Sequence, residues 1–198
     1  MLTIDGQYVR STSGTKGRGF EELNNPRDVC INKSNQWIIA SDSGNHRLVV
    51  YDINNLQVQR LIGGNDTKIN LHFPFGLCCD DEDFLYVCDR GNNRIVVIRF
   101  NDSTIVRQWG RKGIQQGEFD APDFICCRQN VLAVSDFNNH RIQVFTLTGQ
   151  FLFTFGKLGS GDNGEFRYPR GIAIDDEGFF IVWNEIKLCL KVDIILYI

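Results

Sequence analysis

The sequence predicts an all-β chain built from repeated four-stranded units, which is the organisation of a β-propeller. A seven-residue block occurs three times, and its aspartates (Asp42, Asp89 and Asp136) follow one another at intervals of 47 residues. The four prolines keep nearly the same interval, at positions 26, 74, 122 and 169. Two independent markers that share one period indicate an internal repeat.

Each repeat contains four short segments typical of β-strands. In the first repeat they fall near residues 28–32, 37–41, 47–52 and 58–62, and the same segments recur about 47 residues later, twice. β-Branched and aromatic residues fill them, while Gly, Asn and Asp separate them. Many are apolar at successive positions, which predicts sheets that are covered on both faces. Such a unit, repeated along the chain, predicts a series of propeller blades.

The recurring block is predicted to form the tight turn between the second and third strands of each blade. Counted from the aspartate, its third residue is Gly44, Gly91 or Asn138, and these residue types tolerate positive φ, so we expect positive φ at all three. The aspartate can accept hydrogen bonds from turn amides, and the arginine begins the third strand, where it can pair with a carboxylate or carbonyl. A structural role is therefore assigned to Asp42, Gly44, Asn45, Arg47, Asp89, Gly91, Asn92, Arg94, Asp136, Asn138, Asn139 and Arg141.

The unit resembles the NHL repeat. The resemblance lies in residues 117–122 (GEFDAP), 136–145 (DFNNHRIQVF) and 164–172 (GEFRYPRGI), and it covers about residues 5–183. It implies a β-propeller, commonly of six blades. The chain is similar to the NHL region of tripartite-motif ubiquitin ligases, in which the propeller follows a RING finger, B-boxes and a coiled coil.

The chain is too short for six such blades, because these would need roughly 280 residues and the chain has 198. Three full repeats are predicted, at about residues 19–63, 64–110 and 111–156, with a partial repeat at 157–183. Residues 5–9 match the beginning of a fourth strand at 148–152. Near the expected turn aspartate of the last repeat stands Trp183, and no Asn and Arg follow at the required offsets. We therefore expect residues 1–183 to form an incomplete ring, residues 184–198 to be a divergent tail, and further blades to be missing from this chain.

Composition and cysteine placement limit the kinds of function that the chain can have. The net charge of −3 gives no general attraction to DNA or to an anionic membrane, and no apolar run reaches the ~18 residues of a membrane-spanning helix. Six of the seven cysteines replace small or apolar residues at equivalent strand positions, which favours free thiols and a cytoplasmic protein. They form no C-x2-C pair and share no ligand spacing with the histidines, so no metal or cofactor is expected.

Motifs for nucleophilic, zinc-dependent and phosphate-binding chemistry are missing from the sequence, and the chain is predicted not to be an enzyme. Some propellers of this general kind are lyases or lactonases that hold a metal in the central channel. That chemistry needs inward-facing His, Asp or Glu from several inner strands. Here the inner strands offer mainly Cys, Ile, Leu, Val and Ala, so we treat a propeller lyase or hydrolase as the less favoured alternative.

Binding is therefore the predicted function. In a propeller, the loops that lead into the first strands and the turns between second and third strands emerge on one face, which we call the loop face; loops on a rigid scaffold commonly carry function. The candidate binding residues on this face are Arg27, Ser43, His46, Phe75, Arg90, Asn93, Asp123, Phe137, His140 and Arg170.

Two kinds of partner remain open for the loop face. NHL proteins use this face for RNA or for protein partners, and arginines with aromatic residues can stack on single-stranded bases. However, the loops are mixed in charge and show no continuous basic patch of the kind that RNA binding favours. We therefore favour a protein partner, with the chain as the substrate-reading part of a ubiquitin ligase, and keep sequence-selective single-stranded RNA binding as the alternative.

Overall fold

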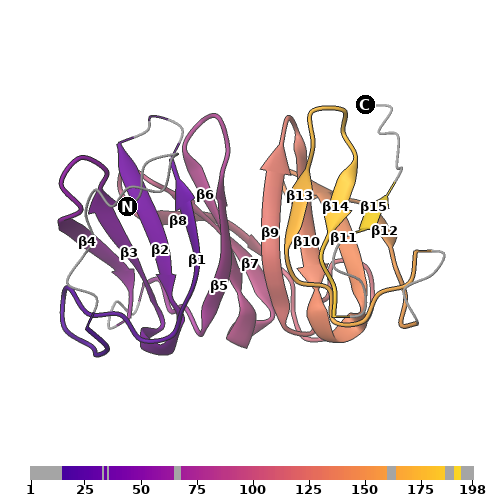
Figure 1. The fold of residues 1–198 in the computed structure, drawn as a ribbon, viewed down its shortest axis with the longest axis horizontal. Helices are drawn as coiled ribbons and strands as arrows, with labels where there is room; N and C mark the ends of the chain where they lie inside the picture. The colour runs from indigo at the N-terminus through magenta and orange to yellow at the C-terminus, as the bar shows by residue number, and fades with distance from the viewer. Residues whose placement is uncertain are drawn as a thin grey trace, which may run out of the picture.

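The chain folds into consecutive antiparallel sheets. The computed structural model describes residues 15–32, 34, 36–64, 68–159, 164–185 and 190–192. These residues form three four-stranded sheets and one three-stranded sheet, each with its strands in sequence order. Figure 1 shows the sheets side by side, with the first sheet at one end of the row and the C-terminal sheets at the other. The predicted all-β blade architecture is confirmed, and the ring is not closed.

The strands recur with the period of the sequence markers. The first sheet contains β1 (Pro26–Ile31), β2 (Trp37–Asp42), β3 (Arg47–Asp52) and β4 (Val58–Gly63). The second contains β5 (Pro74–Cys79), β6 (Phe84–Asp89), β7 (Arg94–Arg99) and β8 (Thr104–Trp109). The third contains β9 (Pro122–Arg128), β10 (Val131–Asp136), β11 (Arg141–Thr146) and β12 (Phe151–Phe155). The fourth contains β13 (Ile172–Ile174), β14 (Phe180–Val182) and β15 (Leu190–Val192).

Apolar side chains fill the space between neighbouring sheets. Ile39 and Leu48 of the first sheet pack with Leu77 and Val96 of the second. Equivalent clusters lie between the second and third sheets and between the third and fourth. Both faces of the second and third sheets are thus buried, which explains why their strands are apolar at successive positions. Burial of this kind is the main favourable contribution to the stability of the fold.

The first strands of neighbouring sheets approach one another closely along the inner side of the arc. In the first two sheets, the second residue after the blade proline faces the next sheet: Asp28 Oδ2 accepts a hydrogen bond of 2.8 Å from the backbone N–H of Leu77. At the equivalent position of the second sheet, a Cβ atom on Gly76 would lie 2.6 Å from Phe124 Cα. Glycine is required at Gly76 because the backbone of the third sheet occupies that space.

The turns between the second and third strands are short 3-10 turns that end in a left-handed residue. They are η1 (Ser43–Asn45), η2 (Arg90–Asn92) and η3 (Phe137–Asn139). Each is closed by the next residue in the left-handed region, at φ values of 58°, 53° and 56° for His46, Asn93 and His140. The location of the turn was predicted correctly from the sequence.

The prediction of positive φ at Gly44, Gly91 and Asn138 is wrong, because the left-handed residue comes two positions later. These positions are instead sites of close backbone approach. The N–H of Gly44 donates to Asn24 O at 2.8 Å, and a Cβ on Gly44 would lie 2.8 Å from the same oxygen. In the third sheet, where Asn138 stands, the corresponding bond to Asp120 O is longer, at 3.1 Å.

The fourth sheet keeps the backbone path of the repeat but loses its turn block. The N–H of Glu185 donates to Arg167 O at 3.1 Å, the bond that Asn138 makes in the third sheet, so Trp183 takes the position of the turn aspartate. β15 pairs antiparallel with β14, and part of the tail predicted to be divergent therefore contributes a strand. The N-terminal match at residues 5–9 lies outside the described residues.

Candidate functional site

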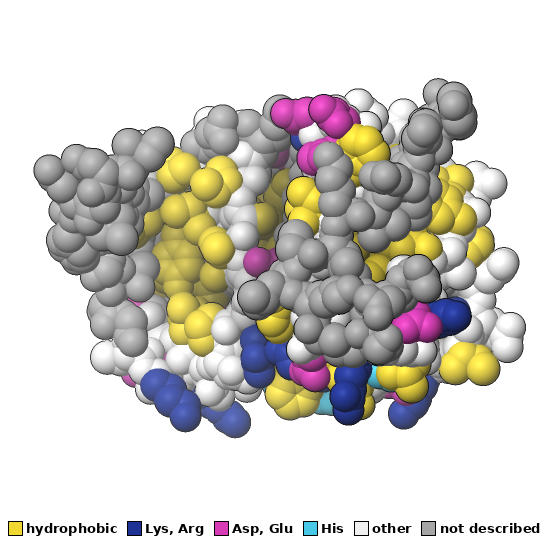
Figure 2. Space-filling view, turned by 45° about the vertical axis from the view of Figure 1, so that its right-hand side comes forward, with side chains coloured by type: hydrophobic (Ala, Val, Ile, Leu, Met, Phe, Trp, Pro, Cys, Tyr) yellow, Lys and Arg dark blue, Asp and Glu magenta, His cyan; other side chains and the backbone are white. Residues whose placement is uncertain are grey.

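Charged and aromatic side chains are distributed unevenly over the molecule. Figure 2 shows Lys and Arg gathered with hydrophobic and His side chains along the lower edge, whereas Asp and Glu gather at the upper edge. The lower edge is the loop face. The upper edge carries the turns at residues 80–83 and 175–178, which together contain seven carboxylates. The loop face therefore carries basic and aromatic side chains together with some carboxylates, whereas the upper edge is mainly acidic.

Five loop-face residues from four different sheets form a continuous row, which we call the arginine–aromatic row. It runs through Arg27, Phe75, Arg90, Phe137 and Arg170. The guanidinium carbons lie between 4.7 and 5.6 Å from the neighbouring ring centroids, within the ~6 Å range of a cation–π contact. All five were sequence-predicted candidates, and the structure brings them together.

A buried carboxylate fixes the centre of the row. Asp123 is 2% exposed, and its Oδ1 accepts a hydrogen bond of 3.0 Å from Arg90 Nε. Burial raises the pKa of Asp123, and the nearby positive charges of Arg90, Arg170 and Arg27 oppose that rise. Asp123, itself a candidate binding residue, thus holds Arg90 in place from below and is not presented to solvent.

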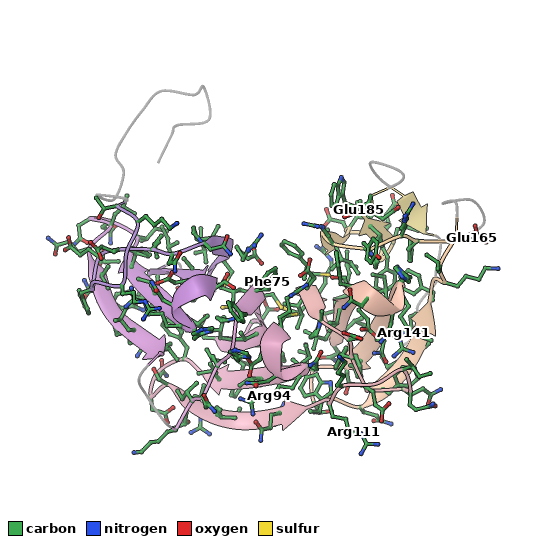
Figure 3. All side chains as sticks on the ribbon, turned by 90° about the horizontal axis from the view of Figure 1, so that it is seen from below. Phe75, Arg94, Arg111, Arg141, Glu165 and Glu185 are labelled. Atoms are coloured by element: carbon green, nitrogen blue, oxygen red, sulfur yellow. The ribbon has the colours of Figure 1, made fainter. Side chains whose placement is uncertain are left out.

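The three turn aspartates hold the loops of the same face. Asp89 is fully buried; its Oδ1 accepts from the N–H of His72 at 2.7 Å, and its Oδ2 accepts from Asn92 Nδ2 at 2.9 Å and Arg94 Nε at 2.6 Å. The same three bonds recur at Asp42 and Asp136. In Figure 3, Arg94 and Arg141 come from neighbouring blades of the arc, while Phe75 lies nearer its open, concave side. The turn aspartates therefore hydrogen-bond to other parts of the fold, which is the structural role predicted for the turn block.

The left-handed turn residues fasten each blade to the next. His46 Nδ1 accepts a hydrogen bond from the N–H of Phe73 at 3.0 Å, and His140 Nδ1 accepts one from Tyr168 at 3.1 Å. Asn93 Oδ1 makes the equivalent bond with the next blade, at 2.8 Å. Histidine and asparagine thus supply the same acceptor at one repeat position. In each of these three candidate binding residues, one side-chain acceptor atom is therefore already used in a hydrogen bond between blades.

We expect the two histidines to make folding stability pH-dependent. Burial lowers the pKa of His46 and of His140, and the nearby positive charges of His72 and Arg18 at His46 and of Arg167 at His140 lower it further. Protonation of Nδ1 would also remove the acceptor of the blade-to-blade bond. The unfolded chain then binds more protons below about pH 6.5, so stability should fall as the pH falls from that value towards the lowered folded pKa.

Asparagine at both positions tests this dependence. The double variant His46→Asn/His140→Asn should keep the acceptor, as Asn93 does, and lose the pH effect. The measurement is the urea-unfolding free energy of both proteins at pH 7.5 and pH 5.5. An equal decline in both proteins would refute the assignment to these histidines.

The structure departs from the sequence-based site in two respects. Ser43 was predicted to lie on the binding surface, but it is fully buried, with an exposed fraction of 0%. Three aromatic residues were not predicted: Phe73 and Tyr168 contact the histidines of the adjoining turns edge-on, and the ring centroid of Trp183 lies 5.9 Å from the guanidinium carbon of Arg170. Phe73 and Tyr168 directly precede blade prolines. A large aromatic residue at this repeat position was the sequence signal that could have identified them as loop-face residues.

The inner strands offer thiols but no metal site among the described residues. Six described cysteines are free, and Cys30 Sγ lies 3.7 Å from Cys79 Sγ across neighbouring sheets. Burial raises the pKa of Cys88, Cys126 and Cys78, which keeps these thiols protonated. No group of three or more His, Cys, Asp or Glu with metal-binding geometry occurs in the described part of the chain. A search of the same residues finds no helix with the length and apolar character needed to cross a membrane.

Comparison with known proteins supports the repeat assignment. The NHL repeat profile matches residues 23–51 and 71–98, which lie in the first two sheets. No curated protein gives a significant match.

The fold is shared with several solved propellers. Virginiamycin B lyase from Staphylococcus aureus is 17% identical with a TM-score of 0.65, over 93% of this chain and 55% of the lyase chain. Hydrazine synthase from Kuenenia stuttgartiensis is 15% identical with a TM-score of 0.63, over 88% of this chain and 45% of that chain. The chain thus spans about half the length of these structures, and at this identity the likeness concerns the fold alone. Residues 23–51 and 71–98 thus carry NHL repeats, and the described residues fold as consecutive propeller-like blades whose ring is not closed.

Proposed function

We propose that the chain is a non-catalytic binding scaffold that recognises a protein partner through its loop face. The observation that carries the proposal is the arginine–aromatic row, which joins residues of four sheets on a single surface. Arginine and aromatic residues, phenylalanine included, are enriched in protein interfaces relative to the rest of the surface. Because the row stands on packed strands and short turns, little conformational entropy is lost when a partner binds.

Single-stranded RNA is the second candidate partner, and a specific observation supports it. Arg90 and Phe137 lie beside one another on the loop face, with the guanidinium 5.6 Å from the ring centroid, and such pairs can support stacked bases. The charge pattern weighs against it. Arg111 pairs with Glu118 at 2.7 Å, and Lys157 pairs with Glu165 at 3.5 Å, so the basic residues around the row are partly neutralised.

Parallel selections decide between the two partner classes. The chain is immobilised and challenged with a random ten-residue peptide library and with a random single-stranded RNA pool. We expect convergent peptides, bound about tenfold more weakly by Phe137→Ala, and no convergent RNA. Phe20→Ala is the matched control, since Phe20 is 51% exposed and lies outside the row. Sequence-selective RNA with steep salt dependence would establish the alternative instead.

We also propose that this arc belongs to a larger assembly of blades. On the outer flank of the first sheet, the apolar side chains of Val29 and Ile31 are 58% and 50% exposed. Further blades would cover such a flank. The resemblance to tripartite-motif ligases supports a substrate-reading role in a ubiquitin ligase, and a RING finger encoded upstream in the full-length gene would test it. The free thiols support a cytoplasmic location.

A further inference from the structure

We propose that the arginine–aromatic row binds a short, extended, acidic peptide segment through the outer edges of its guanidinium groups. The inference rests on the proposed function and specifies the chemistry of the partner.

The ring faces of the row are already occupied. Phe75 has the guanidinium carbons of Arg27 and Arg90 each 4.7 Å from its centroid. Phe137 has those of Arg90 and Arg170 at 5.6 and 5.1 Å. A base could stack on either ring only by displacing a guanidinium. The occupied faces therefore disfavour base stacking and leave the guanidinium edges for a ligand.

The guanidinium edges retain hydrogen-bonding capacity. The Arg27 side chain is exposed and makes no hydrogen bond or ion pair with the described residues, so its N–H donors face solvent. Arg90 uses Nε on Asp123, and Arg170 makes a 3.3 Å contact with Glu185 in which both side chains are about 40% exposed. A guanidinium carries five donors in a planar fork that matches a carboxylate. The row thus presents guanidinium donors from the first, second and fourth sheets on one surface.

The balance of charge fits a few carboxylates better than a chain of phosphates. The three arginines of the row face two carboxylates, Asp123 and Glu185, so the row keeps a small positive excess. Affinity for nucleic acid comes largely from neutralising a series of phosphates, and this small positive excess can neutralise few of them. The acidic turns at residues 80–83 and 175–178 on the opposite face also steer an acidic ligand towards the loop face.

The dimensions and surroundings of the row suit an extended segment. Four steps of 4.7 to 5.6 Å lead from Arg27 to Arg170, so about six residues of extended chain, at ~3.3 Å each, can follow it. Trp183 is 38% exposed and lies beside Arg170 at the end of the row, and Phe73, which is 39% exposed, precedes Phe75 by two residues in the chain. They offer apolar contacts to side chains that alternate with the carboxylates.

Binding measurements on the peptides recovered by selection test the inference. We expect the recovered sequences to be enriched in Asp and Glu, and fluorescently labelled copies to lose at least about tenfold in affinity when their Glu residues become Gln. Arg27→Gln and Arg170→Gln in the protein should each weaken binding to a similar degree. Arg111→Gln is the control, because Arg111 lies on the same face, outside the row, with an 81% exposed side chain; it should change affinity less than about twofold. Thermal melts confirm that the variants are folded.

The outcomes separate the two proposals. Recovered peptides that lack carboxylates but compete at the loop face would overturn the inference and leave the proposed function standing. Acidic peptides whose affinity is unchanged by Arg27→Gln and Arg170→Gln would also overturn it. Recovery of selective RNA, or of no peptide, would overturn both.

Discussion

Asp89→Ala is expected to destabilise the protein by about 3 kcal/mol or more, because it removes one partner of a buried ion pair. The carboxylate is fully buried and accepts hydrogen bonds from His72 N, Asn92 Nδ2 and Arg94 Nε. Alanine leaves the backbone N–H of His72 without its acceptor and Arg94 without its counter-ion. Urea unfolding measures the loss.

Two further variants identify the cause of that loss. Asp89→Asn keeps an acceptor for His72 but lacks the charge, and its stability should lie between those of the wild type and Asp89→Ala. Asp102→Ala removes an exposed carboxylate that pairs with Arg99 at 3.2 Å, so its effect should be far smaller. Equal losses for Asp89→Ala and Asp102→Ala would show that the turn block does not hold the loops.

Gly76→Ala should cost about 1–3 kcal/mol, because the added methyl group meets backbone that cannot move aside. Its Cβ would lie 2.6 Å from Phe124 Cα and 2.8 Å from Asp123 O. The sequence supplies a matched control at the same repeat position: a Cβ on Gly171 would meet only Trp183 Cβ, at 3.8 Å. Gly171→Ala should therefore leave the free energy of unfolding nearly unchanged.

Comparing Gly76→Ala with Gly171→Ala also tests whether the arc belongs to a larger assembly of blades. If another blade follows the fourth sheet in a longer protein, Gly171 will face its backbone, and Gly171→Ala should then be as harmful there as Gly76→Ala is here. In the 198-residue chain, equal losses of stability for Gly76→Ala and Gly171→Ala would contradict the observed arrangement, in which Gly76 faces the backbone of a following blade and Gly171 does not.

The fold could be predicted from the sequence because two markers repeat with one period and the strands between them are apolar on both faces. The observed strands begin and end within two residues of those predicted for the first repeat. The φ prediction failed at Gly44 and Gly91 because glycine serves two purposes, a left-handed backbone or close packing, and sequence alone does not separate them. Here close packing applies, since a Cβ on Gly91 would lie 2.6 Å from His72 O.

The site was predicted only in part, for a related reason. Variation at two repeat positions pointed to Phe75, Arg90 and Phe137, but contacts between blades decide that these side chains form a row with covered ring faces. His46 and His140 were read as surface residues, whereas they share an acceptor role with the asparagine of the second blade. The sequence places His46, Asn93 and His140 at one repeat position. All three side chains can accept a hydrogen bond, and this shared property could have predicted a bond between blades.

Hydrogen–deuterium exchange of the chain, with and without a peptide recovered by selection, tests the central claim most directly. The account predicts that the peptide slows exchange at the loop face, in the turns at residues 90–93 and 137–140 and in the segment at 72–75. Amides in the opposite turns, at residues 80–83 and 175–178, should exchange at unchanged rates. Protection confined to those opposite turns would contradict recognition through the loop face.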